Sequence, residues 1–220
     1  MQNHLLFSRI DLYSILYKVS FRNQENQIVD KLKLLKMMNH MVPGLLAIDN
    51  NFRGPTASVS TASSSGAVAI GEAYHKIKHG KADFIIAGGA DFNLNKPFFG
   101  GMEAFGAACR KYNDSPETAS RPYDTTRAGP VSSDGAGLLA LENYDQAVKR
   151  NANIYAELVG YGHTTDAYHI LRPVENGFGI WRAAKIALEE AGITPDQIDH
   201  VNSHATATPV GDLAEAVALK

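Results

Sequence analysis

The stretch ASVSTASSSGAVAIGEAYHKIKHG, residues 57–80, decides the fold. Its first five residues include the β-branched Val59 and Thr61 and predict a strand over 57–61. Three serines and Gly66 then predict a tight turn, after which apolar residues recur at helical spacing. Basic side chains in the last turn and Gly80 end the helix, as the helix dipole favours. A strand, a serine-rich turn and a helix together are typical of an α/β fold.

The rest of the chain alternates in the same way. A long loop rich in glycine and proline interrupts it after Gly89, and loops of this length are usually functional. We expect strands at 83–87, 137–142, 154–161 and 198–202, and helices at 144–150, 180–191 and 211–220.

The composition is that of an ordinary globular protein. The 220 residues are 45% hydrophobic and 20% charged, with a net charge of -2 and no basic stripe, which argues against binding to nucleic acid. No apolar run approaches the ~18 residues of a membrane span. The single cysteine, Cys109, excludes an intrachain disulfide and favours a reducing, intracellular compartment.

The first two dozen residues have two interpretations. Arg9, Lys18 and Arg22 stand among apolar side chains with one acid, Asp11, as in a mitochondrial presequence. An ordinary amphipathic first helix would show the same pattern.

The serine-rich turn is the first candidate site. A residue there lies at a helix N-terminus, where the dipole stabilises negative charge, although serines at this position also cap helices. The pattern Ala62-x-Ser64-x-Gly66 approximates the nucleophile elbow of serine hydrolases, with a triad drawn through Asp199 and His204. Against that hydrolase hypothesis, alanine replaces the first glycine of the elbow.

Metal and cofactor sites have less support. His75 and His79 share a helix face but lack the glutamate of a zinc-binding HExxH motif. His200 and His204 have no carboxylate cluster around them. No GxGxxG sequence follows a strand, so we expect neither a metal nor a nucleotide cofactor.

Several longer motifs point in one direction. They are SVSTASSSGA at 58–67, AIGEA at 69–73, IIAGGAD at 85–91, ASRPYD at 119–124, IYAELVGYG at 154–162, DAYHI at 166–170 and VNSHATATP at 201–209. Taken in order, they resemble the β-ketoacyl-ACP synthases, the condensing enzymes of fatty acid and polyketide synthesis. The similarity covers residues 36–220 and leaves 1–35 as a non-matching segment, either a targeting peptide or irregular.

The resemblance implies a thiolase-like α/β fold, here the incomplete central part of a layered α/β/α/β/α architecture of two related halves. It implies decarboxylative condensation of an acyl thioester with malonyl-ACP, with acyl carrier protein as partner. Ser63 stands where the family has its nucleophilic cysteine, and His204 matches the first family histidine. Strand 57–61 would pair across a homodimer or a heterodimer with another ketosynthase.

Three departures from the family predict impaired or absent catalysis. Serine replaces cysteine at 63, and a hydroxyl titrates far above a thiol. The chain stops at Lys220, before the family's lysine and second histidine. The loop after Arg127 lacks the family's pocket-lining aromatic and methionine side chains. Cys109 does not match the nucleophile and is expected to be a small buried side chain.

Three hypotheses about function therefore remain open. The chain is part of a 3-oxoacyl-ACP synthase of fatty acid biosynthesis, a catalytically silent partner of such a synthase, or a serine hydrolase. The presequence-like start favours a mitochondrial over a cytoplasmic location.

Overall fold

We describe residues 5–6 and 38–220 of a computed structural model of the chain. They divide into two compact units. The sheet unit comprises residues 5–6, 38–89 and 136–156, and the helical unit comprises 90–135 and 157–220. The predicted targeting segment and the predicted boundary between residues 35 and 36 lie outside the described residues, apart from 5–6.

The sheet unit is built on four strands in the order β2-β3-β1-β4. Short β1 pairs antiparallel with β3, Leu5 opposite Leu141, and with β4 on its other side. The bounds are Leu5–Leu6 for β1, Phe84–Asp91 for β2, Gly135–Glu142 for β3 and Ile154–Ala156 for β4.

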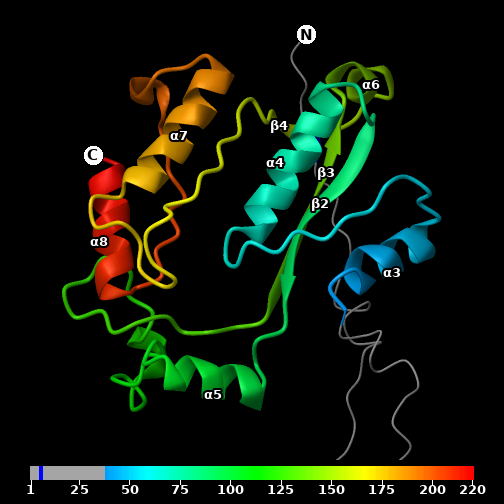
Figure 1. Ribbon diagram of the computed structural model, residues 1–220. Coiled ribbons are helices and arrows are strands. Elements are labelled where there is room, and N and C mark those ends of the chain that lie inside the picture. Colours follow the sequence, from blue (N-terminus) through cyan, green and yellow to red (C-terminus); the bar gives the residue numbers. More distant parts are fainter. Residues whose placement is uncertain (1–4, 7–37) are drawn as a thin grey trace, which may run out of the picture. The chain divides into compact units, whose positions relative to one another are not determined.

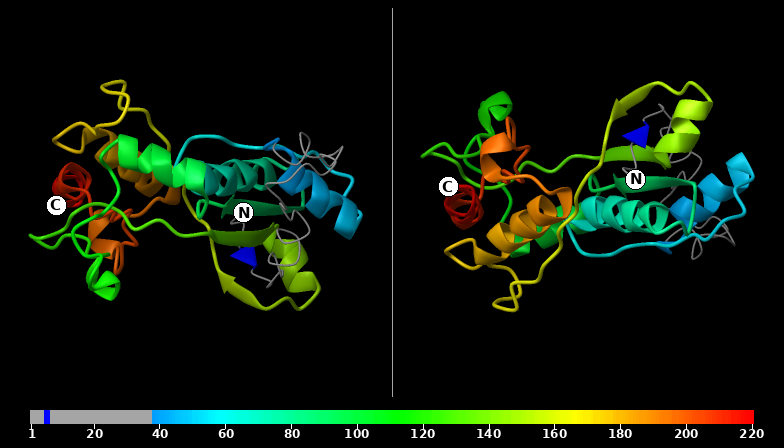
Figure 2. Two further views of the ribbon diagram at one scale, coloured as in Figure 1. Left: turned by 90° about the horizontal axis from the view of Figure 1, so that it is seen from below. Right: turned by 90° about the horizontal axis from the view of Figure 1, so that it is seen from above.

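Helix α4 (Ser65–Lys78) runs along one face of β2 and β3 (Figures 1 and 2). It buries Val68, Tyr74 and Ile77, and β3 buries Leu141. At its end Gly80 has φ +65°. There the Gly80 and Lys81 N–H groups bond to the Ile77 and Lys76 carbonyls, a Schellman motif that confirms the predicted helix end. The core of this unit therefore lies between α4 and the sheet.

Glycines let backbone approach backbone beside the serine turn. A Cβ on Gly88 of β2 would lie 2.1 Å from the Gly137 carbonyl oxygen of β3. A Cβ on Gly66 would lie 3.5 Å from the Gly89 nitrogen. The first turn of α4 therefore contacts β2 directly, with no side chain between them.

Two shorter helices complete the sheet unit. They are α3 (Met41–Asn50) and α6 (Tyr144–Lys149). The Asn143 side chain caps α6 by accepting the Asp145 N–H at 3.1 Å. Arg150, just past α6, pairs with Glu142 at the end of β3 at 2.7 Å.

The helical unit contains α5 (Lys96–Ala104), α7 (Phe178–Ala191) and α8 (Pro209–Ala218), with single 3-10 turns η1 (Pro116–Thr118) and η2 (Pro195–Gln197). Helices α7 and α8 pack on each other. The described residues buried in this unit are small or acidic, and the largest of their side chains to be fully buried is that of Asp212. None of the described helices is both long and apolar enough to cross a membrane.

The structure confirms the predicted strands at 83–87 and 137–142 and the predicted helices at 144–150, 180–191 and 211–220, with end shifts of a few residues. It corrects three predicted strands. Residues 57–61 form only an isolated bridge between Thr61 and Ser63, β4 ends at Ala156, and 198–202 is not a strand. A strand requires a neighbour to pair with, and β-branched composition alone does not supply one. The predicted long loop also contains α5, which Asn95 caps through the Phe98 N–H at 3.0 Å.

The glycine contact between β2 and β3 predicts a stability difference. Gly88→Ala should lower the free energy of unfolding by about 3 kcal/mol or more, because the new methyl group would overlap a backbone oxygen that cannot move away. Gly137→Ala is the matched control in the neighbouring strand, where no described atom lies within 4 Å of the added Cβ. Urea midpoints of both variants measure this, and equal midpoints would contradict the packing described.

Candidate functional site

The three serine hydroxyl groups of the turn differ in the hydrogen bonds that they form. The Ser64 hydroxyl donates to the Thr61 carbonyl at 2.7 Å, and the Ser65 hydroxyl donates to the Ala62 carbonyl at 2.7 Å. The Ser65 oxygen also accepts the Thr61 N–H at 2.8 Å. By contrast, Ser63 is exposed and its hydroxyl forms no hydrogen bond with any described residue. Of the three serines, Ser63 alone therefore has its hydroxyl available for chemistry.

The capping interpretation of the serines needs a correction. Ser64 occupies the N-cap position of α4, but its side chain makes no capping hydrogen bond. It reaches back to Thr61 instead and holds the turn that precedes the helix. Ser63 follows Ala62, which has φ +53°, a left-handed conformation that is costly for an L-residue with a side chain. The hydroxyls of Ser64 and Ser65 thus stabilise a strained turn that presents Ser63.

His204 lies in the helical unit, so the two predicted site residues fall in different units. Its imidazole is exposed and bonds to no described residue. Its backbone N–H, however, donates to Glu215 Oε1 at 2.6 Å. The next residue, Ala205, has φ +48° and donates its N–H to Glu215 Oε2 at 2.9 Å. Like Ser63, His204 therefore adjoins an alanine in the left-handed region, here held by a carboxylate.

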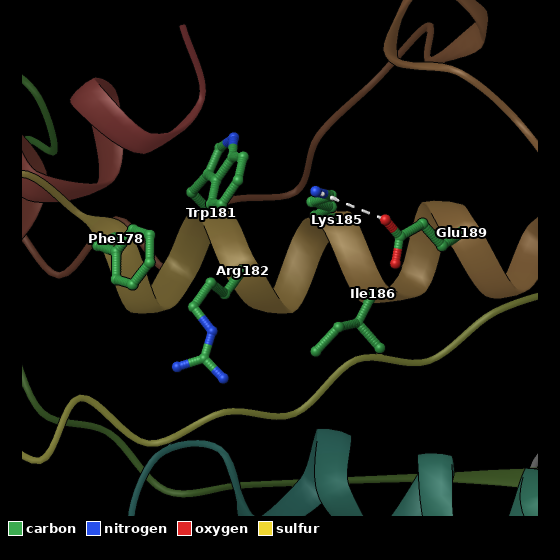
Figure 3. Close-up of a pocket in the computed structure, with 6 residues that line it drawn as sticks. All are labelled: Phe178, Trp181, Arg182, Lys185, Ile186 and Glu189. Carbon is green, nitrogen blue, oxygen red and sulfur yellow. Dashed lines mark ion pairs between the residues drawn. The ribbon is translucent and has the colours of Figure 1, made fainter.

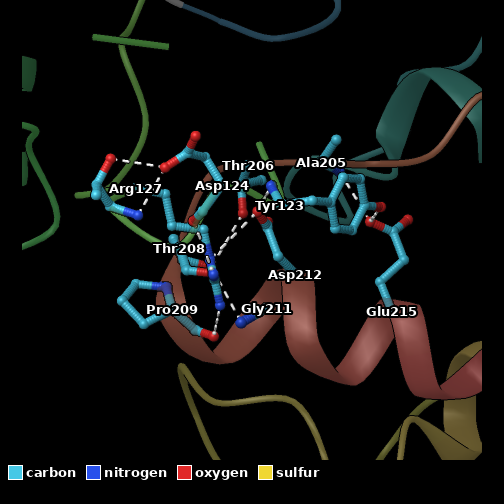
Figure 4. A network of polar contacts seen from close by, with 11 residues as sticks. Tyr123, Asp124, Arg127, Ala205, Thr206, Thr208, Pro209, Gly211, Asp212 and Glu215 are labelled. Atoms are coloured by element: carbon cyan, nitrogen blue, oxygen red, sulfur yellow. Dashed lines mark hydrogen bonds and ion pairs between the residues drawn. The ribbon is translucent and has the colours of Figure 1, made fainter. Parts of the chain in front are cut away.

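Glu215 receives a third hydrogen bond from the Tyr123 hydroxyl, at 2.7 Å (Figure 4). Burial alone would raise the pKa of Glu215, but the N–H groups of Ala205 and His204 and the Tyr123 hydroxyl outweigh it and lower the pKa below its ordinary value. Burial first, and the carboxylates of Glu215 and Asp212 in addition, raise the pKa of Tyr123. Tyr123 thus stays protonated as the donor and Glu215 ionised as the acceptor.

Asp212, one helical turn before Glu215, holds a second set of contacts. Its Oδ2 accepts the Tyr123 N–H at 2.7 Å and lies 3.5 Å from Arg127 Nε. The Arg127 guanidinium also donates to the carbonyls of Thr208 at 3.1 Å and Pro209 at 2.6 Å (Figure 4). The loop that carries His204 is thereby joined to the segment around Tyr123 and to the start of α8.

Two further contacts hold the far end of the His204 loop. The Gly129 N–H donates to the carbonyl of Ala207, which has φ +61°, at 3.0 Å. Thr208 caps α8 by accepting the Gly211 N–H at 3.1 Å. Sequence reasoning missed Glu215 and Arg127 as site residues, because their partners lie up to 92 residues away along the chain.

Other predicted candidates gain no support. The rings of His75 and His79 lie with centroids 5.8 Å apart and are tilted by 46°, and the described residues contain no group of three potential metal ligands. Asp199 makes no hydrogen bond to His204, so within the described residues the predicted hydrolase triad is not assembled. Cys109 is partly exposed rather than buried.

A shallow groove on α7 contains neither Ser63 nor His204 (Figure 3). Trp181 and Lys185 point to one side of the helix, and Arg182 and Ile186 to the other. Lys185 forms an exposed ion pair with Glu189 at 3.7 Å. This groove is therefore a feature of one helix surface and not the predicted site.

The lowered pKa of Glu215 predicts a pH-dependent stability. Ionised Glu215 contributes fully to the free energy of unfolding at a pH above the ordinary glutamate pKa of about 4.3. This contribution is lost as the pH falls through the lower pKa of the folded state. Glu215→Gln should therefore cost about 2 kcal/mol at pH 7, because an amide cannot accept all three hydrogen bonds. The difference from wild type should shrink on acidification below about pH 4.

Urea unfolding at both pH values tests this, with Glu189→Gln as the control. Glu189 is an exposed glutamate of the same unit, and its substitution should change stability by less than about 0.5 kcal/mol. A Glu215→Gln penalty that persists unchanged in acid would show that the charge does not matter.

Comparison with known proteins places these features in one family. The family model "Beta-ketoacyl synthase, N-terminal domain" matches residues 13–147, and "Beta-ketoacyl synthase, C-terminal domain" matches residues 155–220. The mitochondrial 3-oxoacyl-[acyl-carrier-protein] synthase of Arabidopsis thaliana is 43% identical over 185 residues, covering 84% of this chain and 40% of the relative. The 3-oxoacyl-[acyl-carrier-protein] synthase 2 of Vibrio cholerae is 45% identical over 183 residues, covering 82% of this chain and 44% of the relative.

Solved structures agree with this assignment. A type II polyketide ketosynthase in complex with its acyl carrier protein and bound to a hexaketide superimposes with a TM-score of 0.84 at 28% identity, covering 89% of this chain and 48% of that one. The ishigamide ketosynthase/chain length factor superimposes with a TM-score of 0.79 at 30% identity, covering 86% of this chain and 45% of that one. The chain thus spans less than half the length of these relatives. With two adjoining family models along almost its whole length and the thiolase-like α/β fold of its structural neighbours, this chain belongs to the β-ketoacyl synthase family.

Proposed function

We propose that this chain is part of a 3-oxoacyl-ACP synthase of fatty acid biosynthesis, with Ser63 at the acyl-acceptor position and His204 as the first histidine. The observation that carries the proposal concerns the Ser63 hydroxyl, which forms no hydrogen bond with a described residue. The hydroxyls of its neighbours Ser64 and Ser65 hold the turn in which it lies. The reaction class is decarboxylative condensation of an acyl thioester with malonyl-ACP. Acyl carrier protein is the proposed partner, in keeping with the family and with a relative solved in complex with one.

The serine limits what this site does. A thiol at a helix N-terminus becomes a thiolate near neutral pH, but a serine hydroxyl does not and needs a base within hydrogen-bond reach. No described residue bonds to the Ser63 hydroxyl in that way. We therefore propose that the chain by itself condenses acyl groups poorly or not at all.

A catalytically silent partner is the second candidate. It is favoured by Ser63 and by likeness to a ketosynthase/chain length factor assembly. In this role the chain pairs with a competent ketosynthase, as a homodimer or heterodimer subunit. For the location we propose the mitochondrion, which accords with the name of the Arabidopsis relative.

A condensation assay separates the two candidates. Acyl-ACP and malonyl-ACP are supplied to the wild-type chain and to Ser63→Cys, and both 3-oxoacyl-ACP formation and release of carbon dioxide are measured. We expect no condensation by the wild-type chain, because no described residue bonds to the Ser63 hydroxyl as a general base would. Turnover by the wild type would refute the proposed impairment, and stimulation of a co-purified ketosynthase would support the silent partner.

Chemical labelling tests the position itself. In Ser63→Cys the new thiol should react with iodoacetamide at neutral pH severalfold faster than a thiol in Ser60→Cys, because the N-terminus of α4 lowers its pKa from about 8.5. Ser60 is also exposed but precedes the turn. Site-resolved mass spectrometry gives both rates and that of Cys109 in each sample. Equal rates at 60 and 63 would count against Ser63 as an activated position.

A further inference from the structure

Helix α7 contacts its own unit with one side and turns another side outward. The backbone of residues 160–162 approaches the Ala183 and Ala187 carbonyls so closely that no Cβ would fit on its two glycines. These alanines therefore mark the inner side of α7. Trp181 and Lys185 each precede one of the alanines by two residues, which is about 200° around a helix. They lie on the side of α7 opposite to these backbone contacts.

Six residues form this outward side, and half of them are large and apolar. We call them the α7 outer face: Phe178, Trp181, Arg182, Lys185, Ile186 and Glu189 (Figure 3). The exposed fractions of Phe178, Trp181 and Ile186 are 51%, 45% and 39%. The solvent side of a helix ordinarily carries polar and charged residues. The composition of the α7 outer face therefore indicates a contact surface.

Two cations lie beside the aromatic rings of this face. The rings of Phe178 and Trp181 stack with centroids 5.7 Å apart and an interplanar angle of 18°. The Arg182 guanidinium lies 5.7 Å from the Phe178 centroid, and the Lys185 ammonium lies 5.2 Å from the Trp181 centroid. Glu189, the one acid of the face, stands at its C-terminal end. The aromatic part of the face is thus positively charged, although the whole chain has a net charge of -2.

The shape of the α7 outer face excludes a small molecule as its occupant. All six residues belong to one helix, so a small ligand would be covered from one side only. Pockets that hold small ligands bury most of the ligand surface. The face instead runs along α7 for about 17 Å, which suits an extended anionic surface. A lipid bilayer is such a surface, and because it is fluid it conforms to a helix without a matching groove.

We propose that the α7 outer face docks on the surface of an anionic phospholipid membrane. Aromatic side chains favour the boundary between lipid headgroups and acyl chains, so Phe178 and Trp181 enter that layer. Arg182 and Lys185 extend their charged ends to the lipid phosphates, as long basic side chains do at such boundaries. Docking goes beyond the proposed condensation and uses none of the residues assigned to it. Its test reads lipid binding, so its outcome is independent of the condensation assay.

Trp181 is the one tryptophan of the chain, so its fluorescence reports directly on this face. Vesicles of phosphatidylcholine with about half phosphatidylglycerol should shift its emission to shorter wavelength and reduce its quenching by acrylamide. Vesicles of phosphatidylcholine alone should cause a much smaller shift. Added salt should reverse the effect of the anionic vesicles, because it screens the attraction. An unchanged spectrum with anionic vesicles, or an equal shift with neutral ones, overturns the proposal.

A soluble acidic polymer separates a membrane from an acidic protein as the occupant. Poly-glutamate should leave the emission wavelength of Trp181 unchanged, because it offers no apolar layer for the ring to enter. A shift with poly-glutamate and none with anionic vesicles would assign the face to an acidic protein and overturn membrane docking.

Charge reversal tests the two cations. The double variant Arg182→Glu/Lys185→Glu should lower the fraction of chain that co-sediments with anionic vesicles by more than about tenfold. Lys81→Glu/Lys149→Glu is the matched control, because it changes the net charge equally at two exposed lysines of the sheet unit. The control should lower binding by less than about threefold. Equal losses in the two double variants would show that net charge alone directs binding, which overturns docking through α7.

Truncation of the tryptophan tests the aromatic contact in the same co-sedimentation assay. Trp181→Ala should lower binding about fivefold or more, because the apolar area that enters the lipid is lost. Phe105→Ala, which removes a more exposed aromatic ring from α5, should leave binding unchanged. Circular dichroism of each variant verifies that its helices still form. Wild-type binding by Trp181→Ala would contradict insertion of this side chain and overturn the proposal.

Discussion

The helical unit depends on two buried carboxylates of one helix. Asp212 and Glu215 together accept the N–H groups of Tyr123, His204 and Ala205 and the Tyr123 hydroxyl, and Arg127 lies against Asp212. The apolar residues buried in this unit are small, so hydrophobic burial contributes little to the positions of its loops. Charge-assisted hydrogen bonds have fixed direction, and they hold Ala205 in a left-handed conformation that it would not adopt alone. The position of the His204 backbone follows from that constraint.

The sheet unit reaches a similar result by different means. Apolar side chains of α4 and β3 form its core, and Gly66, Gly88 and Gly89 let the backbones of α4, β2 and β3 approach closely. Two serine hydroxyls then hold a left-handed alanine immediately before Ser63. Both predicted site residues are therefore held by strained backbone, which is common at functional sites. The strain is offset by hydroxyl groups in one unit and by a carboxylate in the other.

Much of the fold could be predicted from local patterns, and the failures have one cause. Helix α4 was predictable because its apolar spacing and Gly80 lie within one short stretch. The segments 57–61 and 198–202 have strand composition, but a strand also needs a pairing partner, which composition does not reveal. Helix α5 was missed in a loop rich in glycine and proline, although Asn95 followed by Pro97 is a helix-start signal. Helix α5 buries none of its residues within this chain, so burial does not account for its apolar composition.

The sequence alone determined the α/β class, the family and the positions of Ser63 and His204 in its motifs, because these depend on residue identity and order. The tertiary structure decided which serine hydroxyl is free and which groups hold the His204 loop. Glu215 is an unremarkable acid in the sequence, and its importance depends on Tyr123, 92 residues before it. Ala62 and Ala205 likewise give no local sign of positive φ. Such features arise from contacts between distant segments, and those contacts form only when the chain folds.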